Sequence, residues 1–452
     1  MAERDGPMTG HEQWGSRAGF ILATVGSAVG VGNIWRFSYV AGENGGAAFL
    51  LIYIVCVLLI GLPLVIAELA IGRRAQGDVV AAFAHGGRAG PWRYAGWLSV
   101  VGAVLILSFY AVIAGWALKY FVGAATGALW QTGAAGYGLY FKQFIANLGE
   151  PVAWAAAMLA LTMFVVANGV RQGIETFSRI LMPLLAIIVI ALALYALTLE
   201  GAGRGVAFLF APDWSALRQP QVYVAALGQA FFSIGVGMAI FITFGSYMPR
   251  SFGVGSSAAI IVLGDTLFAV IAGLAIFPAV FSMGLDPRAG PELAFITLPQ
   301  IFLLMPGGEF IGALFFFLLA AAALTSMTSL LEVPVSTAIH HFGLRRWTAT
   351  ALAGLAVFLC GLPSAMSFGV LAHIRIGRYG ILDAVDAGVS NFLLPLGGIL
   401  IALFVGYRLS RDIALAESDL GQTRLGNIWR WLLRTLVPLA IAAILLQSAS
   451  TL

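Results

Sequence analysis

Charged residues are scarce in this chain: of its 452 residues, only 10% are Asp, Glu, Lys or Arg. A soluble globular domain carries about 25% charged residues, so this chain cannot cover a water-facing surface of ordinary composition. Hydrophobic residues make up 60% of the sequence and gather in long runs between short polar loops. The pattern predicts an all-α polytopic membrane protein, because a membrane β-barrel would show segments of about ten residues with alternating polarity.

Cysteine is also nearly absent, and the motifs of common hydrolases are missing. Cys56 and Cys360 each lie in an apolar run, which provides neither a disulfide framework nor a metal site. No G-x-S-x-G or H-E-x-x-H segment occurs, so we expect no enzyme and no cofactor. The net charge of +4 comes from arginines dispersed over short loops, which does not indicate a nucleic-acid partner.

Eleven apolar runs are long enough to cross a membrane, which takes about 20 residues in a helix. The N-terminus carries no cleavable signal pattern, so the first run counts as a span. The predicted spans are roughly 17–39, 46–71, 94–123, 152–168, 174–198, 222–247, 257–283, 308–339, 349–369, 382–408 and 431–449.

The loops between these spans differ in positive charge, which sets the expected orientation. Lys and Arg in short loops collect on the cytoplasmic side, so the bias predicts a cytoplasmic N-terminus. The cytoplasmic segments then hold Arg4, Arg73, Arg74, Arg88, Arg93, Arg171, Arg250, Arg345, Arg346, Arg411 and Arg424. The opposite loops hold Lys142, Arg204, Arg218, Arg288, Arg375 and Arg378.

Two spans contain glycine clusters at mid-length. The first includes AVGVG (28–32) and the sixth includes SIGVG (233–237). Gly costs about 1 kcal/mol in a helix interior relative to Ala, so each cluster favours a local break. Broken helices at membrane depth occur where they line a cavity, and breaks five spans apart are typical of an inverted repeat with its site at the breaks. Close helix packing through small residues is the alternative.

Several segments together resemble the neurotransmitter:sodium symporter family. They are WGSRAGFILATVGSAVGVGNIWRF (14–37), ENGGAAF (43–49), GLPLVIAELAIGR (61–73), QGIE (172–175), FLFAPDW (208–214), GQAFFSIGVG (228–237) and AALTS (322–326). The resemblance implies one transmembrane transporter domain over 1–452. It consists of a five-plus-five inverted repeat with helices 1 and 6 broken (about 16–198 and 222–409) and one extra helix (about 431–449).

The resemblance also implies two sodium sites built from oxygen ligands. The first would use Ala28, Asn33, Ser233 and Asp265 with the substrate carboxylate, and the second would use Gly26, Val29, Ala322, Thr325 and Ser326. Asp265 stands where leucine-transporting bacterial members have Asn. A carboxylate at mid-membrane costs roughly 2.5–3.5 kcal/mol, so we expect it to serve a cation and to make transport chloride-independent. A protonated structural Asp is the alternative.

The family pattern likewise implies an amino-acid site. Tyr110 matches the tyrosine that holds the substrate carboxylate, and Gly30 replaces the Asp with which amine transporters bind an ammonium group. The pocket would be formed by Ser27, Ala28, Val31, Gly32, Ile106, Tyr110, Phe232, Ser233, Gly235, Val236, Met238, Ser326 and Leu330. It holds no charged side chain, which favours a neutral substrate. Relative to the leucine transporter of the family, Gly235 replaces a Ser and Ser27 an Asn, which frees volume, and Met238 replaces a Phe and adapts to irregular shapes. We therefore expect bulky hydrophobic or aromatic L-amino acids.

Gate residues follow from the same resemblance. Arg36 and Asp386 match an outer gate pair, while Trp14 and Tyr247 match the aromatic residues of the inner gate. The salt bridge of the family's inner gate is missing, because its positions hold His11 and His340. Inner closure is then expected to rest on the aromatic residues or on another pair. Glu68 and Glu332, both in apolar spans, are either hydrogen-bond anchors or participants in proton antiport.

The function predicted from these residues is sodium-coupled amino-acid symport by alternating access in the bacterial inner membrane. Its partners would be Na⁺, an L-amino acid and membrane lipid. A channel or a non-transporting amino-acid sensor on the same scaffold is the alternative, and accumulation against a gradient would distinguish them.

Overall fold

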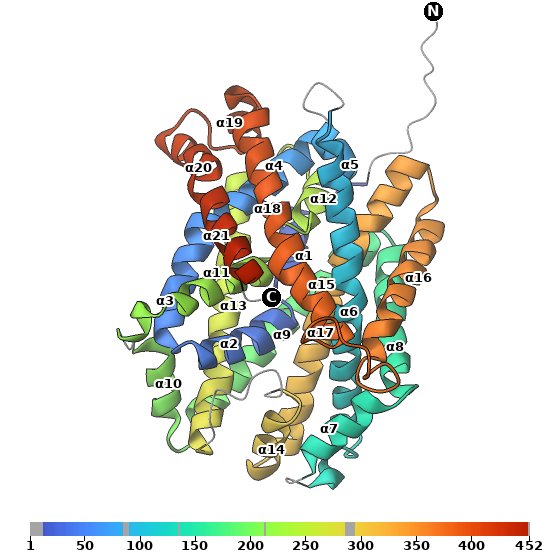
Figure 1. Cartoon of the computed structure of the whole chain (residues 1–452), viewed down its shortest axis with the longest axis vertical. Coiled ribbons are helices and arrows are strands. Elements are labelled where there is room, and N and C mark those ends of the chain that lie inside the picture. The colour runs from blue at the N-terminus through green and yellow to red at the C-terminus, as the bar shows by residue number, and fades with distance from the viewer. Residues whose placement is uncertain (1–11, 85–89, 134–135, 212–213, 285–293, 451–452) are drawn as a thin grey trace, which may run out of the picture.

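The structure is a computed structural model that describes residues 12–84, 90–133, 136–211, 214–284 and 294–450. The described residues are almost entirely helical (Figure 1). Nine helical segments in this part of the chain are long and apolar enough to cross a membrane. They are Ala47–Ala75 (α3, η2, α4), Arg93–Ala125 (α6), Glu150–Ala167 (α8), Val170–Leu197 (η4, α9), Val254–Ser282 (α13), Gly308–Phe342 (α15), Arg346–Ala365 (α16), Ile381–Arg408 (α17, η7, α18, η8) and Arg424–Ser448 (α20, α21).

The two remaining predicted spans are present as broken helices. The first consists of α1 (Arg17–Ala28) followed by η1 (Gly32–Arg36) and α2 (Phe37–Glu43), with a bend of 53°. The sixth is divided into α11 (Pro220–Ile234) and α12 (Ile240–Ser246), so it does not form one continuous span. The predicted start of the last span, residue 431, is too late: the last helical segment of the structure starts at Arg424.

Short helices cover the two ends of the bundle and were not predicted as spans. In Figure 1, α5 and α19 lie at the end where the described chain begins, and α7, α10 and α14 lie at the opposite end. Their bounds are Val79–Ala84 (α5), Tyr137–Ala146 (α7), Ala202–Phe210 (α10), Thr297–Leu304 (α14) and Arg411–Glu417 (α19).

Helices α6 and α15 pack along one another and form much of the buried centre. Helix α15 is bounded by Gly307 and Gly343, whose positive φ values of 68° and 66° suit glycine at helix ends. At the periphery, α9 exposes Ile180, Ile187 and Leu194 at a spacing of seven residues, which places them on one face. Such a stripe suits contact with lipid, so the centre carries the polar groups and the rim is apolar.

Candidate functional site

The first break lies between α1 and η1. Val29 is extended, with φ −71° and ψ 102°, and the chain becomes helical again with the π-helical segment η1 at Gly32. The glycine cluster therefore predicted this break correctly. Gly30 has no room for a side chain, because a Cβ atom there would lie 2.6 Å from the Ser326 Oγ and 2.8 Å from the Tyr110 hydroxyl oxygen.

The second break covers residues 235–239, between α11 and α12. Gly235, Gly237 and Ala239 have φ values of 79°, 86° and 60°, a region that favours glycine. A Cβ atom on Gly237 would lie 2.5 Å from the Leu394 carbonyl oxygen. The buried Glu68 on α4 accepts a hydrogen bond from the Gly237 N–H at 2.7 Å. Glu68 thus has the anchoring role that was one of the two considered from the sequence.

A buried polar cluster joins the first break to α11 and α13. The Asn33 Nδ2 donates to the Asp265 Oδ1 at 2.6 Å and to the Ser233 Oγ at 3.0 Å. The Ser233 hydroxyl donates to the Asp265 Oδ2 at 2.9 Å. The Tyr53 hydroxyl on α3 completes the group, 3.2 Å from the Ser233 Oγ and 3.5 Å from the Asp265 Oδ2. The three side chains expected at the first sodium site thus lie together, and Ala28, expected to contribute its carbonyl, lines the small pocket described below.

Neutral oxygens gather on the other side of the first break, against α15. The Thr325 hydroxyl lies 3.4 Å from the Val29 carbonyl oxygen and 2.8 Å from that of Ala322. The Ser326 hydroxyl lies 3.5 Å and 3.3 Å from the same two oxygens. Gly26 packs against this group, since a Cβ atom on it would be 3.6 Å from the Thr325 Cβ. The residues predicted for the second sodium site are therefore neighbours, and these four oxygens are uncharged.

A small pocket of about 40 Å³ lies between the two breaks. Water needs roughly 10–15 Å³ in this measure, so the pocket has room for about three waters and must enlarge to hold an amino acid. Of the thirteen residues predicted for the substrate, Val31 and Val236 do not line it; Val31 lines the outer cavity and Val236 is buried. The eleven that do are Ser27, Ala28, Gly32, Ile106, Tyr110, Phe232, Ser233, Gly235, Met238, Ser326 and Leu330.

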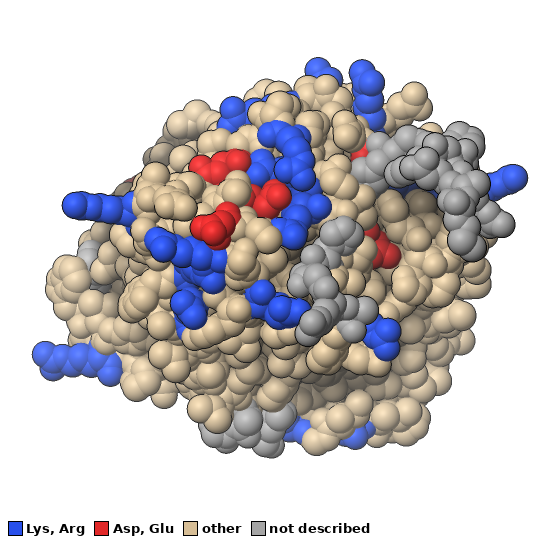
Figure 2. Space-filling model, turned by 90° about the horizontal axis from the view of Figure 1, so that it is seen from above, with Lys and Arg blue, Asp and Glu red and all other residues tan. Residues whose placement is uncertain are grey.

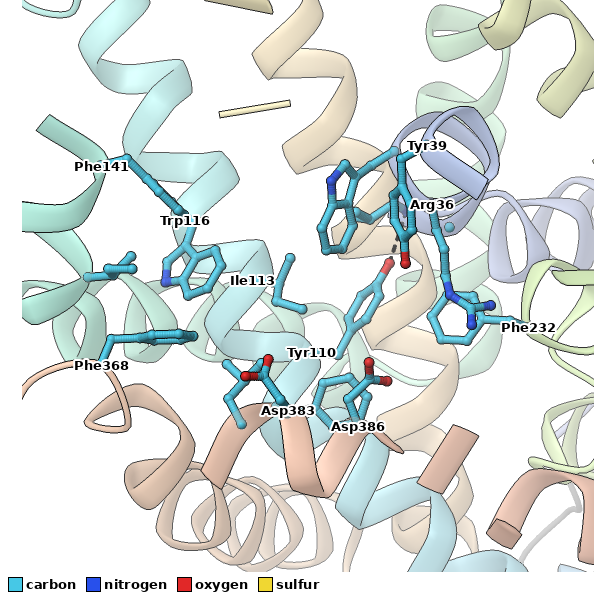
Figure 3. Close-up of a pocket in the computed structure, with 16 residues that line it drawn as sticks. Arg36, Tyr39, Tyr110, Ile113, Trp116, Phe141, Phe232, Phe368, Asp383 and Asp386 are labelled. Atoms are coloured by element: carbon cyan, nitrogen blue, oxygen red, sulfur yellow. Dashed lines mark hydrogen bonds between the residues drawn. The ribbon is translucent and has the colours of Figure 1, made fainter. Parts of the chain in front are cut away.

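A larger cavity of about 330 Å³ lies between this pocket and the end of the bundle that carries α7, which we call the outer end (Figure 3). Tyr110 and Phe232 line both cavities and separate them. The Tyr110 hydroxyl accepts a hydrogen bond from the Val31 N–H at 3.1 Å, so it already faces the break. Movement of the Phe232 ring would join the small pocket to the larger cavity.

The predicted outer gate residues face the larger cavity but are not paired. The Arg36 guanidinium lies 4.4 Å from the centre of the Phe232 ring, and its Nη1 donates to the Gln229 Oε1 at 3.3 Å. Asp386 instead accepts a hydrogen bond from the Ser390 hydroxyl at 2.8 Å. Within the described residues, Arg36 and Asp386 form no ion pair, and both line the larger cavity.

Aromatic residues close the opposite end, which we call the inner end. The Trp14 Nε1 donates to the Phe244 carbonyl at 2.9 Å, and the Trp14 N–H donates to the Tyr247 carbonyl at 3.2 Å. The Trp14 ring packs edge-on against Phe20, Phe244 and Tyr247. Trp14 and Tyr247, the two residues proposed for the inner gate, are therefore in contact.

A cluster of charged side chains lies next to these rings and provides a further pair at the inner end. Arg346, at the start of α16, contacts Glu332 at 2.8 Å and Glu12 at 2.9 Å. The Tyr247 hydroxyl donates to the Glu332 Oε1 at 2.6 Å. Glu332 is fully buried, so its charge is balanced by Arg346. His340 contacts the Ser336 carbonyl, and His11 lies outside the described residues.

Four residues of these networks were not predicted as site residues. Nothing in the sequence distinguishes Tyr53 within its apolar span, whereas Gln229 is a polar residue of the GQAFFSIGVG segment and could have been noticed. Arg346 could have been found, because the buried Glu332 needs a cation and two arginines follow at the next loop. Glu12 meets Arg346 across 334 positions of the chain, a pairing that the sequence does not encode locally.

Comparison with known proteins agrees with this geometry. A model of the sodium:neurotransmitter symporter family matches residues 11–138 and 130–452. The chain is 42% identical to the sodium-dependent transporter YhdH of Bacillus subtilis, over 96% of this chain and 97% of that one. It is 31% identical to a sodium-dependent transporter of Haemophilus influenzae, covering 97% and 98% of the two chains. The crystal structure of MhsT in complex with L-phenylalanine superimposes with a TM-score of 0.91 and 51% identity, over 97% of this chain and all of that one. This match confirms the predicted fold class.

Proposed function

The chain belongs to the sodium:neurotransmitter symporter family, and on that premise we propose that it imports neutral, bulky hydrophobic or aromatic L-amino acids together with sodium. It is a multi-pass sodium-dependent transporter. The further proposals concern its substrate, its ion sites, its anion requirement and its orientation.

The observation that carries the proposal is the environment of Asp265. Its carboxylate is fully buried halfway along α13 and accepts hydrogen bonds from Asn33 and Ser233. No Lys, Arg or His among the described residues forms an ion pair with it. A buried carboxylate without a cation is costly, and hard oxygen ligands suit Na⁺. Sodium at this cluster would supply the missing positive charge.

A second sodium would bind the neutral oxygens of Val29, Ala322, Thr325 and Ser326. These atoms come from the broken part of α1 and from α15, so an ion between them would fix the two helices relative to one another. Neutral ligands suffice there because carbonyls of an unwound helix present their dipoles to a cation. We therefore propose two coupling ions, of which only the first would contact the substrate.

An α-amino acid fits the remaining groups better than an amine does. The Tyr110 hydroxyl and the backbone N–H groups at the start of η1 are suited to bind a carboxylate, which helix N-termini favour. Gly30 has neither a charge nor room for a side chain, so an amine would find no carboxylate there. The related MhsT was crystallised with L-phenylalanine, which supports an aromatic side chain between Ile106, Phe232 and Met238.

Chloride would not be required, because Asp265 already provides a fixed negative charge beside the first sodium. The arginine bias of the loops and the bacterial relatives support a place in the bacterial inner membrane with the N-terminus in the cytoplasm. The outer end would then face the periplasmic side, and the inner end the cytoplasm.

Uptake by purified protein in liposomes tests these proposals. We expect labelled L-phenylalanine to accumulate against its gradient only with a sodium gradient, to the same extent in chloride and gluconate media. Unlabelled tryptophan, tyrosine and leucine should compete, whereas aromatic amines should not. Binding without accumulation would indicate a sensor, sodium flux without amino acid would indicate a channel, and strict chloride dependence would contradict the role of Asp265.

A further inference from the structure

Helix α20 (Arg424–Arg434) has one face buried and one face exposed at the inner end of the bundle. Trp429 and Leu433 are buried, and the Trp429 Nε1 donates to the Pro63 carbonyl at 3.0 Å. Outside this contact, Leu425, Ile428 and Trp431 are 69%, 54% and 58% exposed. Spacings of three residues place these three on adjoining turns of one face. An exposed apolar face of this kind suits the acyl boundary of a bilayer.

Arginines without acidic partners surround this face. Arg408, Arg411, Arg424 and Arg434 are all exposed, and none of them takes part in an ion pair within the described part of the chain. Figure 2 shows basic side chains spread over this end of the molecule, with acidic side chains confined to small groups. We name these four residues the α20 arginines.

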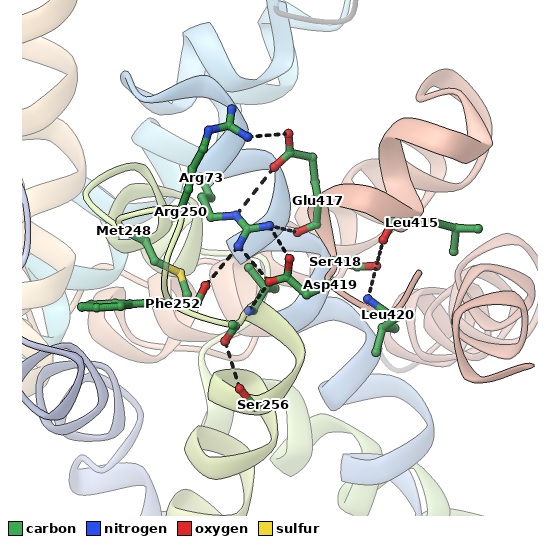
Figure 4. Close-up of polar contacts among 12 residues, drawn as sticks. Arg73, Met248, Arg250, Phe252, Ser256, Leu415, Glu417, Ser418, Asp419 and Leu420 are labelled. Carbon is green, nitrogen blue, oxygen red and sulfur yellow. Dashed lines mark hydrogen bonds and ion pairs between the residues drawn. The ribbon is translucent and has the colours of Figure 1, made fainter. Parts of the chain in front are cut away.

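Two of the three acidic residues of the preceding segment, Glu417 and Asp419, are already paired with other arginines (Figure 4). The third, Asp412, accepts a hydrogen bond from the Gln422 Nε2 at 3.5 Å and forms no ion pair within the described part of the chain. Arg73 binds Asp419 at 2.8 Å, and Glu417 lies 3.6 Å from both Arg73 and Arg250. Asp419 also accepts a hydrogen bond from the Val254 N–H at 2.7 Å, which fixes it away from α20. Glu417 and Asp419 therefore do not compensate the α20 arginines, and Asp412 supplies one negative charge against their four positive charges.

Two of the α20 arginines are held in place without being neutralised. The Arg411 Nη2 donates to the Asn427 Oδ1 at 2.8 Å. The Arg434 guanidinium lies 4.6 Å from the centre of the Tyr407 ring, whose hydroxyl donates to the Arg434 carbonyl at 2.9 Å. A guanidinium has five N–H donors, so each keeps donors free for a further ligand. Tyr407 and Trp431 are exposed aromatic residues of the kind that lies at headgroup level.

We propose that the α20 arginines and the exposed face of α20 form a binding site for anionic phospholipid headgroups. The phosphodiester of a lipid supplies the acceptor oxygens that paired guanidinium donors recognise. The acyl chains of the same lipid cover Leu425, Ile428 and Trp431, which a soluble phosphate would leave exposed. Since Arg430 donates to the Gly406 and Leu409 carbonyls at 3.2 Å, it fixes α20 to the end of η8 (Phe404–Arg408), and a bound lipid would brace this joint.

Native mass spectrometry of delipidated, detergent-purified protein tests the site. Phosphatidylglycerol and phosphatidylcholine are titrated in parallel, and the bound fraction is measured for each. We expect the unmodified protein to favour phosphatidylglycerol and the R411Q/R424Q/R434Q variant to lose at least about tenfold in its affinity, since each arginine near a lipid surface adds an appreciable attraction. The matched control is R204Q/R218Q/R378Q, which removes the same charge from exposed positions at the other end and should retain binding.

A single variant keeps the test decisive if the triple variant does not fold. Arg424 is exposed at the first position of α20, so R424Q leaves the packed face unchanged and should weaken phosphatidylglycerol about threefold. Equal binding of the two lipids by the unmodified protein would overturn the proposal. So would an equal loss in the control variant, because it would show a general effect of net charge.

Discussion

Arg36 at the outer end of the path and Arg346 at the inner end are used in different ways. Arg36 borders an open cavity of about 330 Å³ and rests on the Phe232 ring, with Asp386 on the far side unpaired with it. Arg346 is bound by Glu332 and Glu12 and lies beside the packed rings of Trp14 and Tyr247. An arginine thus borders a cavity without an acidic partner at one end and is paired with two acids at the other, while Tyr110 and Phe232 separate that cavity from the small pocket. Transport by alternating access would require the two ends to exchange these arrangements.

Replacing Arg346 by Gln should disturb this asymmetry most strongly. Glu332 would then remain buried without a cation, and removing one partner of a buried pair costs about 3–5 kcal/mol. We expect the inner end to open, which hydrogen exchange of residues 14–28 in sodium-free nanodiscs would report as faster exchange. R345Q, one residue earlier and exposed, is the matched control. Unchanged exchange in R346Q would show that the aromatic residues close this end alone.

The second-largest effect is expected at the centre of the path, where Asp265 is replaced by Asn. In D265N the fixed negative charge beside the proposed sodium disappears, while the amide keeps the shape of the side chain. We expect sodium to be required at no less than about tenfold higher concentration for half-maximal phenylalanine binding, equivalent to about 1.4 kcal/mol. A scintillation proximity assay over a sodium series measures this. An unaltered sodium dependence would mean that Asp265 is a structural residue.

The chloride dependence of D265N provides a second test of the role of Asp265. If Asp265 supplies the charge that would otherwise come from an anion, then chloride should improve sodium-dependent binding to D265N and leave the unmodified protein unaffected. Gluconate provides the control anion, because it is too large to enter a buried site.

The structure agrees best with the sequence predictions where a local residue pattern determines the backbone conformation. The glycines at 30 and 237 cannot carry side chains, so their clusters mark the two breaks, and the breaks determine where the site lies. Family resemblance then identified the residues that gather around them. Tyr53 and Glu12 were missed because their contacts cross 180 and 334 positions of the chain, and neither residue type is unusual in its own segment. Long-range pairing of this kind depends on how helices pack, which local pattern does not reveal.

At the outer end, Arg36 to Gln should have a moderate effect. In the structure this arginine contacts Gln229 and the Phe232 ring, and its pairing with Asp386 would form only on closure of the outer end. A partly hydrated pair contributes up to about 1 kcal/mol, so we expect phenylalanine to dissociate several-fold faster with sodium affinity preserved. Dissociation of labelled substrate after dilution measures this. D386N should produce the same change, and a double variant no worse than either single variant would show that the two act as a pair.

The smallest effect is expected for the replacement of Glu12 by Gln. This variant distinguishes the contribution of Glu12 from that of Glu332, the other acid that binds Arg346. The Glu12 side chain is 42% exposed, whereas that of Glu332 is fully buried. Water can replace the exposed carboxylate, so the loss should stay within about 1 kcal/mol, and exchange of residues 14–28 should rise far less than in R346Q. Raising the salt concentration should remove the difference between E12Q and the unmodified protein, because salt screens exposed pairs much more than buried ones. A large, salt-insensitive effect of E12Q would instead show that the N-terminal segment itself, through Glu12, holds the inner end closed.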